Sequence, residues 1–268
     1  MLRQPIKTRS TVVLGVVSVL IMFAAYTVIS NWQHEKNPDD TTIPTWNQIG
    51  DGVKKAVEVN PRSGERWVLV DMEATGTRLF LGLLVGIIGA LTLGVLMGCF
   101  STVEAFFIVP LSLLAKVPPT AALAVFFVLV GTDTEMYIAM IAFGIMPILA
   151  QSIYLSVRDV PAELLYKAYT IGASTGEVIW NIIVRAILPQ IIDTIRLQIG
   201  PAMVFLIAAE MVCGDVGFGY RIRLQSRLLN MNVVYFYLAL LAAFGFAIDY
   251  GLRLIQKICC PWYVQGKR

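Results

Sequence analysis

Residues 161–189 read PAELLYKAYTIGASTGEVIWNIIVRAILP and form a partly polar stretch between long apolar runs. Apolar residues recur at helical spacing on both sides of Gly172, which predicts two short amphipathic helices. Gly172 stands where a helix C-cap glycine is expected, and Ser174 with Glu177 fits a capping box that starts the second helix. Pro189 is expected to limit that helix. A helical hairpin of this kind, set between membrane spans, is suited to docking a soluble partner.

This stretch resembles the EAA loop of bacterial ABC-importer permeases on Pro161-x-Glu163-Leu164, Ala168 and Gly172-Ala173-Ser174. Counting back from Gly172, the family's Glu-Ala-Ala falls on residues 166–168, of which only Ala168 is kept. In that family the loop is the cytoplasmic coupling helix, which lies in a groove of the ATPase subunit. The alternative is an amphipathic cytoplasmic loop without a partner. The resemblance implies these ATPase-coupling residues: Glu163, Leu164, Leu165, Tyr166, Lys167, Ala168 and Gly172.

The composition indicates a membrane protein. Of the 268 residues, 57% are apolar and 15% are charged, whereas an average soluble domain has about 25% charged residues. Runs of about 20 apolar residues are long enough to cross a bilayer. We therefore expect an all-α polytopic membrane protein with about six transmembrane helices, and the resemblance implies that five of them form an importer-type transport core.

The resemblance and the apolar runs together divide the chain into five parts. Residues 1–30 are expected to form an N-terminal transmembrane helix, and residues 31–76 an extracytoplasmic loop. Residues 77–255 correspond to the transport core, which contains the coupling loop 157–193, and residues 256–268 to a basic cytoplasmic tail. Lysines and arginines near the span ends divide almost equally between the two sides. The prediction that both termini are cytoplasmic therefore depends on the coupling loop.

The third apolar run, residues 104–130, is interrupted by Lys116, Val117, Pro118 and Pro119. Two adjacent prolines break an ordinary helix, and lipid tolerates the break only where protein or a water-filled cavity surrounds it. An intramembrane lysine is a candidate functional residue. We therefore assign Lys116, Pro118 and Pro119 to the substrate pathway. Snorkelling of the lysine to the cytoplasmic edge remains an equal alternative.

The second span, residues 77–100, is rich in glycine. Gly82-x-x-x-Gly86 and Gly94-x-x-x-Gly98 predict a close approach of neighbouring helices. Thr77-Arg78-Leu79 resembles the start of the family's transport core. The favoured interpretation of Arg78 itself is a snorkelling charge at the membrane surface.

Ala208-Ala209-Glu210, followed by Gly217-Phe218-Gly219-Tyr220, resembles the signature of one subgroup, the permeases for nitrate, sulfonate, taurine and bicarbonate. Glu210 is placed in the substrate pathway as a gate or brace of the outer mouth. Alternatively, it forms a structural ion pair with Arg221 or Arg223, which is the slightly favoured interpretation.

Residues 214–232 are rich in glycine and arginine. Arg221, Arg223 and Arg227 alternate with apolar residues, so an outer helix carrying them would fit an acidic solute-binding protein. A solvated face is the equal alternative. Asp249 resembles the aspartate near the end of the family's last helix.

Several classes of function are excluded or disfavoured. The net charge of +3 calls for no nucleic-acid partner, and the single histidine, His34, leaves no set of catalytic or metal-binding side chains. The chain has no G-x-x-x-x-G-K-[ST] motif, so it is not expected to hydrolyse ATP by that route. Without a set of catalytic residues, it is expected to be a transport subunit, not an enzyme, with no cofactor of its own. ATP and Mg²⁺ are expected in a partner ATPase.

The most consistent function is the permease subunit of an ATP-driven ABC importer in the bacterial inner (plasma) membrane. The resemblance implies a homodimer of permeases in the lipid bilayer, two cytoplasmic ATPases and an extracytoplasmic solute-binding protein. The expected solute is a small anion such as nitrate, a sulfonate, taurine or bicarbonate. The alternative is an ion-gradient-driven secondary transporter or channel, although no inverted repeat is visible.

Overall fold

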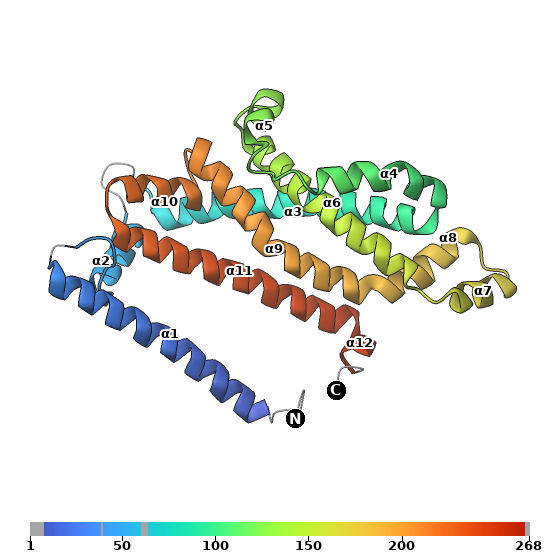
Figure 1. Cartoon of the computed structure of the whole chain (residues 1–268), viewed down its shortest axis with the longest axis horizontal. Coiled ribbons are helices and arrows are strands. Elements are labelled where there is room, and N and C mark those ends of the chain that lie inside the picture. The colour runs from blue at the N-terminus through green and yellow to red at the C-terminus, as the bar shows by residue number, and fades with distance from the viewer. Residues whose placement is uncertain (1–7, 39, 60–63, 266–268) are drawn as a thin grey trace. The chain divides into compact units, whose positions relative to one another are not determined.

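The computed structural model describes residues 8–38, 40–59 and 64–265 (Figure 1). Within these ranges the chain is almost entirely helical, with one isolated bridge between Val59 and Arg66 and no longer strand. The chain-end residues Arg3, Lys7, Lys267 and Arg268 lie outside them. The helices are α1 (Thr8–Lys36), α2 (Trp46–Val57), α3 (Trp67–Cys99), α4 (Ser101–Leu114), α5 (Leu123–Val130), α6 (Thr134–Arg158), α7 (Ala162–Thr170), α8 (Thr175–Glu177), the π-helix η1 (Val178–Val184), α9 (Arg185–Cys213), α10 (Phe218–Arg227), α11 (Met231–Cys259) and α12 (Pro261–Gln265).

The described residues contain five helical runs that are long and apolar enough to cross a membrane. They correspond to α1, α3, α6, the continuous run α8–η1–α9 and α11. The all-α polytopic fold is therefore confirmed. The remaining expected span, residues 104–130, consists of the short helices α4 and α5 on either side of the Pro118–Pro119 break.

Two helix boundaries differ from the prediction. α3 begins at Trp67, ten residues before the expected start of the transport core at Thr77. Pro189 does not limit the second hairpin helix, because it lies inside α9 and the helical run continues to Cys213. A membrane helix tolerates such a proline where neighbouring groups use the freed carbonyls. Gln256 Nε2 of α11 also donates a hydrogen bond to the carbonyl of Pro189 at 2.9 Å.

The chain forms two compact units, of which the first contains residues up to 68 and 222–238. Within it, α2 is a short helix that starts with a capping box of Thr45 and Gln48. Trp46 at its start packs edge-on against Tyr26 of α1, and its Nε1 donates a hydrogen bond to Thr27 Oγ1 at 2.9 Å. Packing thus accounts for Trp46.

The second unit contains residues 69–221 and the chain from 239 onward. Its α3 and α6 touch along the predicted glycine stripe. A Cβ atom built on Gly82 would lie 2.7 Å from Ile141 Cβ, and one on Gly98 would lie 2.4 Å from Val157 Cβ. Because these glycines have no side chain, the backbones of α3 and α6 can approach each other closely near both ends of the contact.

α9 packs along α6, and α11 is tied to α9 by charge. Arg196 Nε lies 2.8 Å from Asp249 Oδ1, and Arg253 Nε lies 2.9 Å from Asp249 Oδ2. The aspartate recognised in the sequence therefore joins the last long helix to α9.

Candidate functional site

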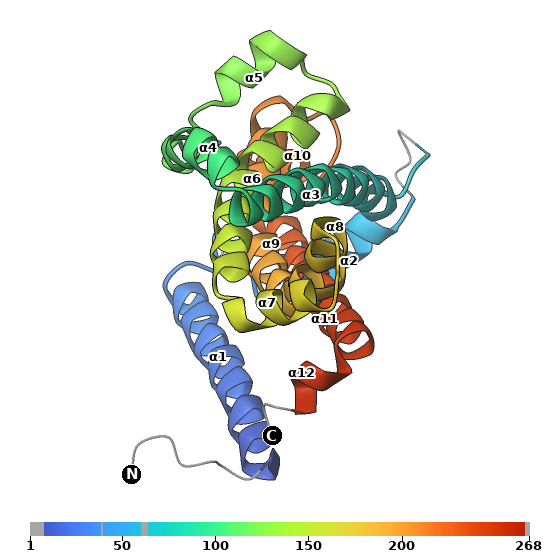
Figure 2. The ribbon, with the colours of Figure 1, turned by 90° about the vertical axis from the view of Figure 1, so that its right-hand side faces the viewer.

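The predicted helical hairpin is present as α7 and α8–η1, beyond one end of α6 and α9 (Figures 1 and 2). α7 ends in a Schellman motif, in which Ala173 N–H donates to the Ala168 carbonyl at 3.1 Å and Gly172 N–H to the Tyr169 carbonyl at 3.0 Å. Gly172 has a φ of +88°, a left-handed conformation that favours glycine. The capping box of Ser174 and Glu177 is also present. Local sequence chemistry thus fixes both sides of the turn.

The hairpin has one buried face and one exposed face. Ala168 is only 5% exposed and packs in the same core as Val178 and Ile183, so it anchors the hairpin and offers no surface for an ATPase. The predicted role of Ala168 in ATPase coupling stays a prediction, and Leu165 is half-buried in the same core. The exposed face carries Glu163, Leu164, Tyr166, Lys167, Tyr169, Ile171, Gly172 and Trp180.

The hairpin is packed firmly onto the membrane helices. Its buried residues share a core with Met97 of α3 and with Ile153 and Val157 of α6. The hairpin and the neighbouring ends of α3 and α6 therefore share one hydrophobic core.

A second polar site lies at the other end of α3. Arg78 and Gly98 are 20 residues apart, which corresponds to about 30 Å along a helix. Arg78 Nη1 donates to Glu210 Oε1 of α9 at 3.0 Å, and Thr75 Oγ1 donates to the same carboxylate at 3.0 Å. The side chains of Arg78 and Glu210 are 9% and 0% exposed. This is a buried ion pair that joins two membrane helices.

The loop after α9 closes over this pair. Gly219 N–H donates to Glu210 Oε2 at 2.9 Å, and Phe218 N–H donates to Thr75 Oγ1 at 2.9 Å. Gly217 has a φ of +116°, and a Cβ atom there would lie 2.5 Å from Glu210 Oε1. The glycines of the subgroup signature thus let the backbone reach the carboxylate.

A second buried ion pair holds the start of α10. Arg221 Nε lies 2.8 Å from Asp71 Oδ2, and Gly217 N–H donates to Asp71 Oδ1 at 3.0 Å. Both side chains are buried. We call the set Asp71, Thr75, Arg78, Glu210 and Arg221 the buried charge cluster.

The buried charge cluster corrects three interpretations. Arg78 is not a snorkelling surface charge, and Glu210 pairs with Arg78 rather than with Arg221 or Arg223. Arg221 is buried with Asp71 and presents no outer surface, whereas Arg223 is half-buried and Arg227 is exposed.

Sequence reasoning missed Asp71 and Thr75, because they were assigned to the loop before the transport core. Thr75 follows Asp71 by four residues and Arg78 follows Thr75 by three, and these spacings place all three on one helical face. This spacing was the available signal.

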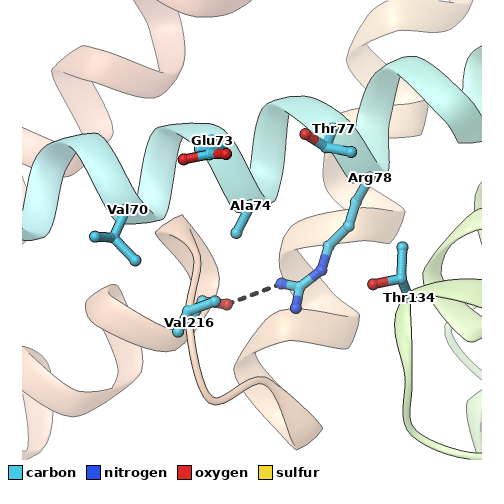
Figure 3. A pocket seen from close by; sticks show the side chains of 7 residues that line it. All are labelled: Val70, Glu73, Ala74, Thr77, Arg78, Thr134 and Val216. Carbon is cyan, nitrogen blue, oxygen red and sulfur yellow. Dashed lines mark hydrogen bonds between the residues drawn. The ribbon is translucent and has the colours of Figure 1, made fainter.

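Two neighbouring cavities adjoin the buried charge cluster, and both are lined by Arg78 and Thr134. One, of about 370 Å³, also contains Val70, Glu73, Ala74, Thr77 and Val216 (Figure 3). The other, of about 560 Å³, also contains Thr132, Asp133, Glu135, Cys213 and Asp215.

The predicted pathway residues Lys116, Pro118 and Pro119 lie in the turns between α4 and α5. Lys116 and Pro118 are exposed, whereas Pro119 is buried. A Cβ atom on Gly144 of α6 would meet Pro119 Cγ at 2.9 Å and the Phe205 ring at 2.4 Å. Gly144 thus provides the space in which the proline break is seated. In the described part of the chain, no three His, Cys, Asp or Glu side chains are grouped to hold a metal ion.

Comparison with known proteins gives consistent matches. The profile of the family described as "Binding-protein-dependent transport system inner membrane component" matches residues 80–258. The chain is 28% identical over 192 residues to the taurine transport system permease protein TauC of Escherichia coli, covering 72% of this chain and 70% of TauC. It is 29% identical over 185 residues to the putative aliphatic sulfonates transport permease protein SsuC of Bacillus subtilis, covering 69% of this chain and 67% of SsuC.

Two further matches extend the comparison. A putative ABC transporter permease protein of Methanocaldococcus jannaschii is 30% identical over 187 residues, covering 69% of this chain and 70% of its own. A chain of the MetNI methionine ABC transporter, solved in an inward-facing conformation, has a TM-score of 0.61 at 16% identity and covers 70% of this chain and 94% of its own. This structural likeness concerns the fold.

Proposed function

Because this chain belongs to the family of inner-membrane components of binding-protein-dependent transport systems, we propose that it is the permease subunit that carries a small sulfonate in an ATP-driven importer. The family is one of transport subunits, and ATP hydrolysis takes place in a separate subunit. The taurine and aliphatic sulfonate permeases among its relatives support the substrate class.

The proposed assembly contains two copies of this chain, two cytoplasmic ATPases that bind ATP and Mg²⁺, and an extracytoplasmic solute-binding protein. The exposed face of the hairpin is the proposed ATPase contact, so the hairpin and both termini lie in the cytoplasm. The buried charge cluster then lies at the outer end of the transport core. Arg223 and Arg227 remain proposed contacts for the binding protein.

The exposed face of α7 carries this proposal. Tyr166 is 70% exposed and Ile171 is 86% exposed at the end of a membrane helix bundle, and large exposed apolar residues of this kind mark protein interfaces. Because Ala168 and Val178 are buried with residues of α3 and α6, closure of the ATPases would move the inner ends of these helices as one body. Rocking of the two copies would then alternate access to the pathway.

The test is ATPase activity of the purified complex in lipid, with and without a sulfonate and its binding protein. Stimulation by the loaded binding protein is expected. Tyr166→Ala should release the ATPase during purification, whereas Tyr250→Ala, at another exposed tyrosine on α11, should not. Uptake by the chain alone, driven by an ion gradient without ATP, would replace the proposal with a secondary transporter or channel.

A further inference from the structure

Arg78 has hydrogen-bonding capacity that the protein does not use. A guanidinium has five N–H donors. Nη1 donates to Glu210 Oε1 at 3.0 Å and to the Val216 carbonyl at 2.8 Å. Nη2 comes no closer than 3.9 Å to Asp215 Oδ1, which is beyond hydrogen-bond distance. Among the described residues, therefore, Nη2 and Nε have no hydrogen-bond acceptor.

Even without a ligand, contacts within the protein hold the Arg78 guanidinium in place. It lies over the Tyr137 ring, with 4.1 Å between Cζ and the ring centroid, and the side chain is 9% exposed. Figure 3 shows Arg78 reaching from α3 towards Val216, with Thr134 beside it. A rigid, partly unsatisfied guanidinium at a cavity wall is suited to bind a sulfonate or carboxylate through two parallel hydrogen bonds.

The larger cavity is also lined by acidic side chains, opposite in charge to Arg78. Asp133, Glu135 and Asp215 line it together with Arg78 and Thr134. The charge of Arg78 is already balanced by Glu210. A simple anion would therefore meet three carboxylates, whereas a simple cation would leave the guanidinium donors unused.

We propose that this cavity is a subsite for a small zwitterion that has a sulfonate and an ammonium group separated by a short chain. The sulfonate accepts hydrogen bonds from Arg78 and Thr134, and the ammonium group faces Asp133, Glu135 and Asp215. This inference rests on the proposed function and narrows its substrate class to aminosulfonates. The site would receive the solute at the end of α3 remote from the hairpin.

The direct test is a binding titration of the permease–ATPase complex in lipid nanodiscs without the binding protein. The probes are taurine, 2-hydroxyethanesulfonate, which lacks the amine, and β-alanine, which has a carboxylate in place of the sulfonate. Taurine should bind at least about tenfold more tightly than 2-hydroxyethanesulfonate, which corresponds to about 1.4 kcal/mol. Equal binding of these two probes, or tighter binding of β-alanine than of taurine, would overturn the proposal.

The variants use exposed residues, because a change of Arg78 would leave Glu210 buried without its partner. Asp133→Asn with Glu135→Gln should weaken taurine binding about tenfold and leave 2-hydroxyethanesulfonate unaffected. Thr134→Val should weaken the binding of both taurine and 2-hydroxyethanesulfonate. Asp159→Asn, which changes an exposed carboxylate at the other end of α6, should change neither.

The two proposals fail differently. If a loaded sulfonate-binding protein stimulates ATP hydrolysis but the double variant binds taurine as well as the parent does, the subsite is wrong and the importer function stands. If no sulfonate stimulates ATP hydrolysis or is taken up, the proposed substrate class fails, and the subsite falls with it.

Discussion

Arg78 of α3 and Glu210 of α9 form an ion pair across 3.0 Å, and neither side chain is more than 9% exposed. Asp71 and Arg221 form the second ion pair of the buried charge cluster. With two carboxylates and two guanidiniums, the cluster has no net charge. The loop from Gly214 to Gly219 is held to this cluster by backbone N–H groups. The cluster therefore joins α3, α9 and the start of α10.

Glu210→Ala should destabilise the protein more than the double variant Arg78→Met with Glu210→Met. The single change leaves a buried guanidinium without its carboxylate, which costs about 3–5 kcal/mol, whereas an apolar pair of similar volume restores much of the loss. The thermal unfolding midpoints of the purified variants measure the difference. A double variant less stable than Glu210→Ala would show that the pair itself supplies the stability.

Gly217→Ala should also destabilise this site. The new Cβ atom would lie within 2.7 Å of the Glu210 carboxylate. The backbone at Gly217 also has a left-handed φ of +116°, which disfavours alanine. Gly131→Ala is the matched control, because Gly131 has a φ of +91° and open space around its Cβ position. Strain at φ alone costs about 1–2 kcal/mol. The thermal unfolding midpoint should therefore fall further for Gly217→Ala than for Gly131→Ala. An equal fall in the two midpoints would argue against contact of the new Cβ atom with Glu210.

The hairpin was predictable from sequence, whereas the buried charge cluster was not. Gly172 and the capping residues Ser174 and Glu177 act on their own neighbours in the chain, so their spacing is sufficient. Glu210 and Arg78 are separated by 132 residues. Proximity in the chain favoured Arg221 as the partner, and only the packing of α3 against α9 shows the true pair.

Gly98→Ala should force α3 and α6 apart at the end that carries the hairpin. Its Cβ atom would lie 2.4 Å from Val157 Cβ, and overpacking of this kind costs about 1–3 kcal/mol. Adding Val157→Ala should recover only part of that loss, because it removes the Cγ1 atom at 2.5 Å and keeps the Cβ atom at 2.4 Å. The control is Gly89→Ala, whose nearest neighbour is the flexible Met146 side chain at Sδ. A double variant no more stable than Gly98→Ala would contradict this packing.

Lys116→Met should lower uptake of an anionic solute several-fold without changing the yield of folded complex. Lys116 is exposed in the turn after α4, and its side chain has no ion pair among the described residues. Loss of its charge therefore leaves no buried partner behind. Lys55→Met, on the exposed side of α2, is the control. Unchanged uptake would assign Lys116 to the membrane edge.

Gly172→Val should uncouple ATP hydrolysis from transport while the permease remains folded. The φ of +88° at Gly172 is strongly disfavoured for a β-branched residue, although the space around its Cβ position is open. The Schellman turn would therefore distort, and the exposed face of α7 would shift relative to the core that holds Ala168. Transport per ATP hydrolysed, measured in proteoliposomes, should fall. Gly172→Asn should keep most of the coupling, because asparagine tolerates the left-handed conformation; wild-type coupling in the valine variant would remove the proposed role of the hairpin.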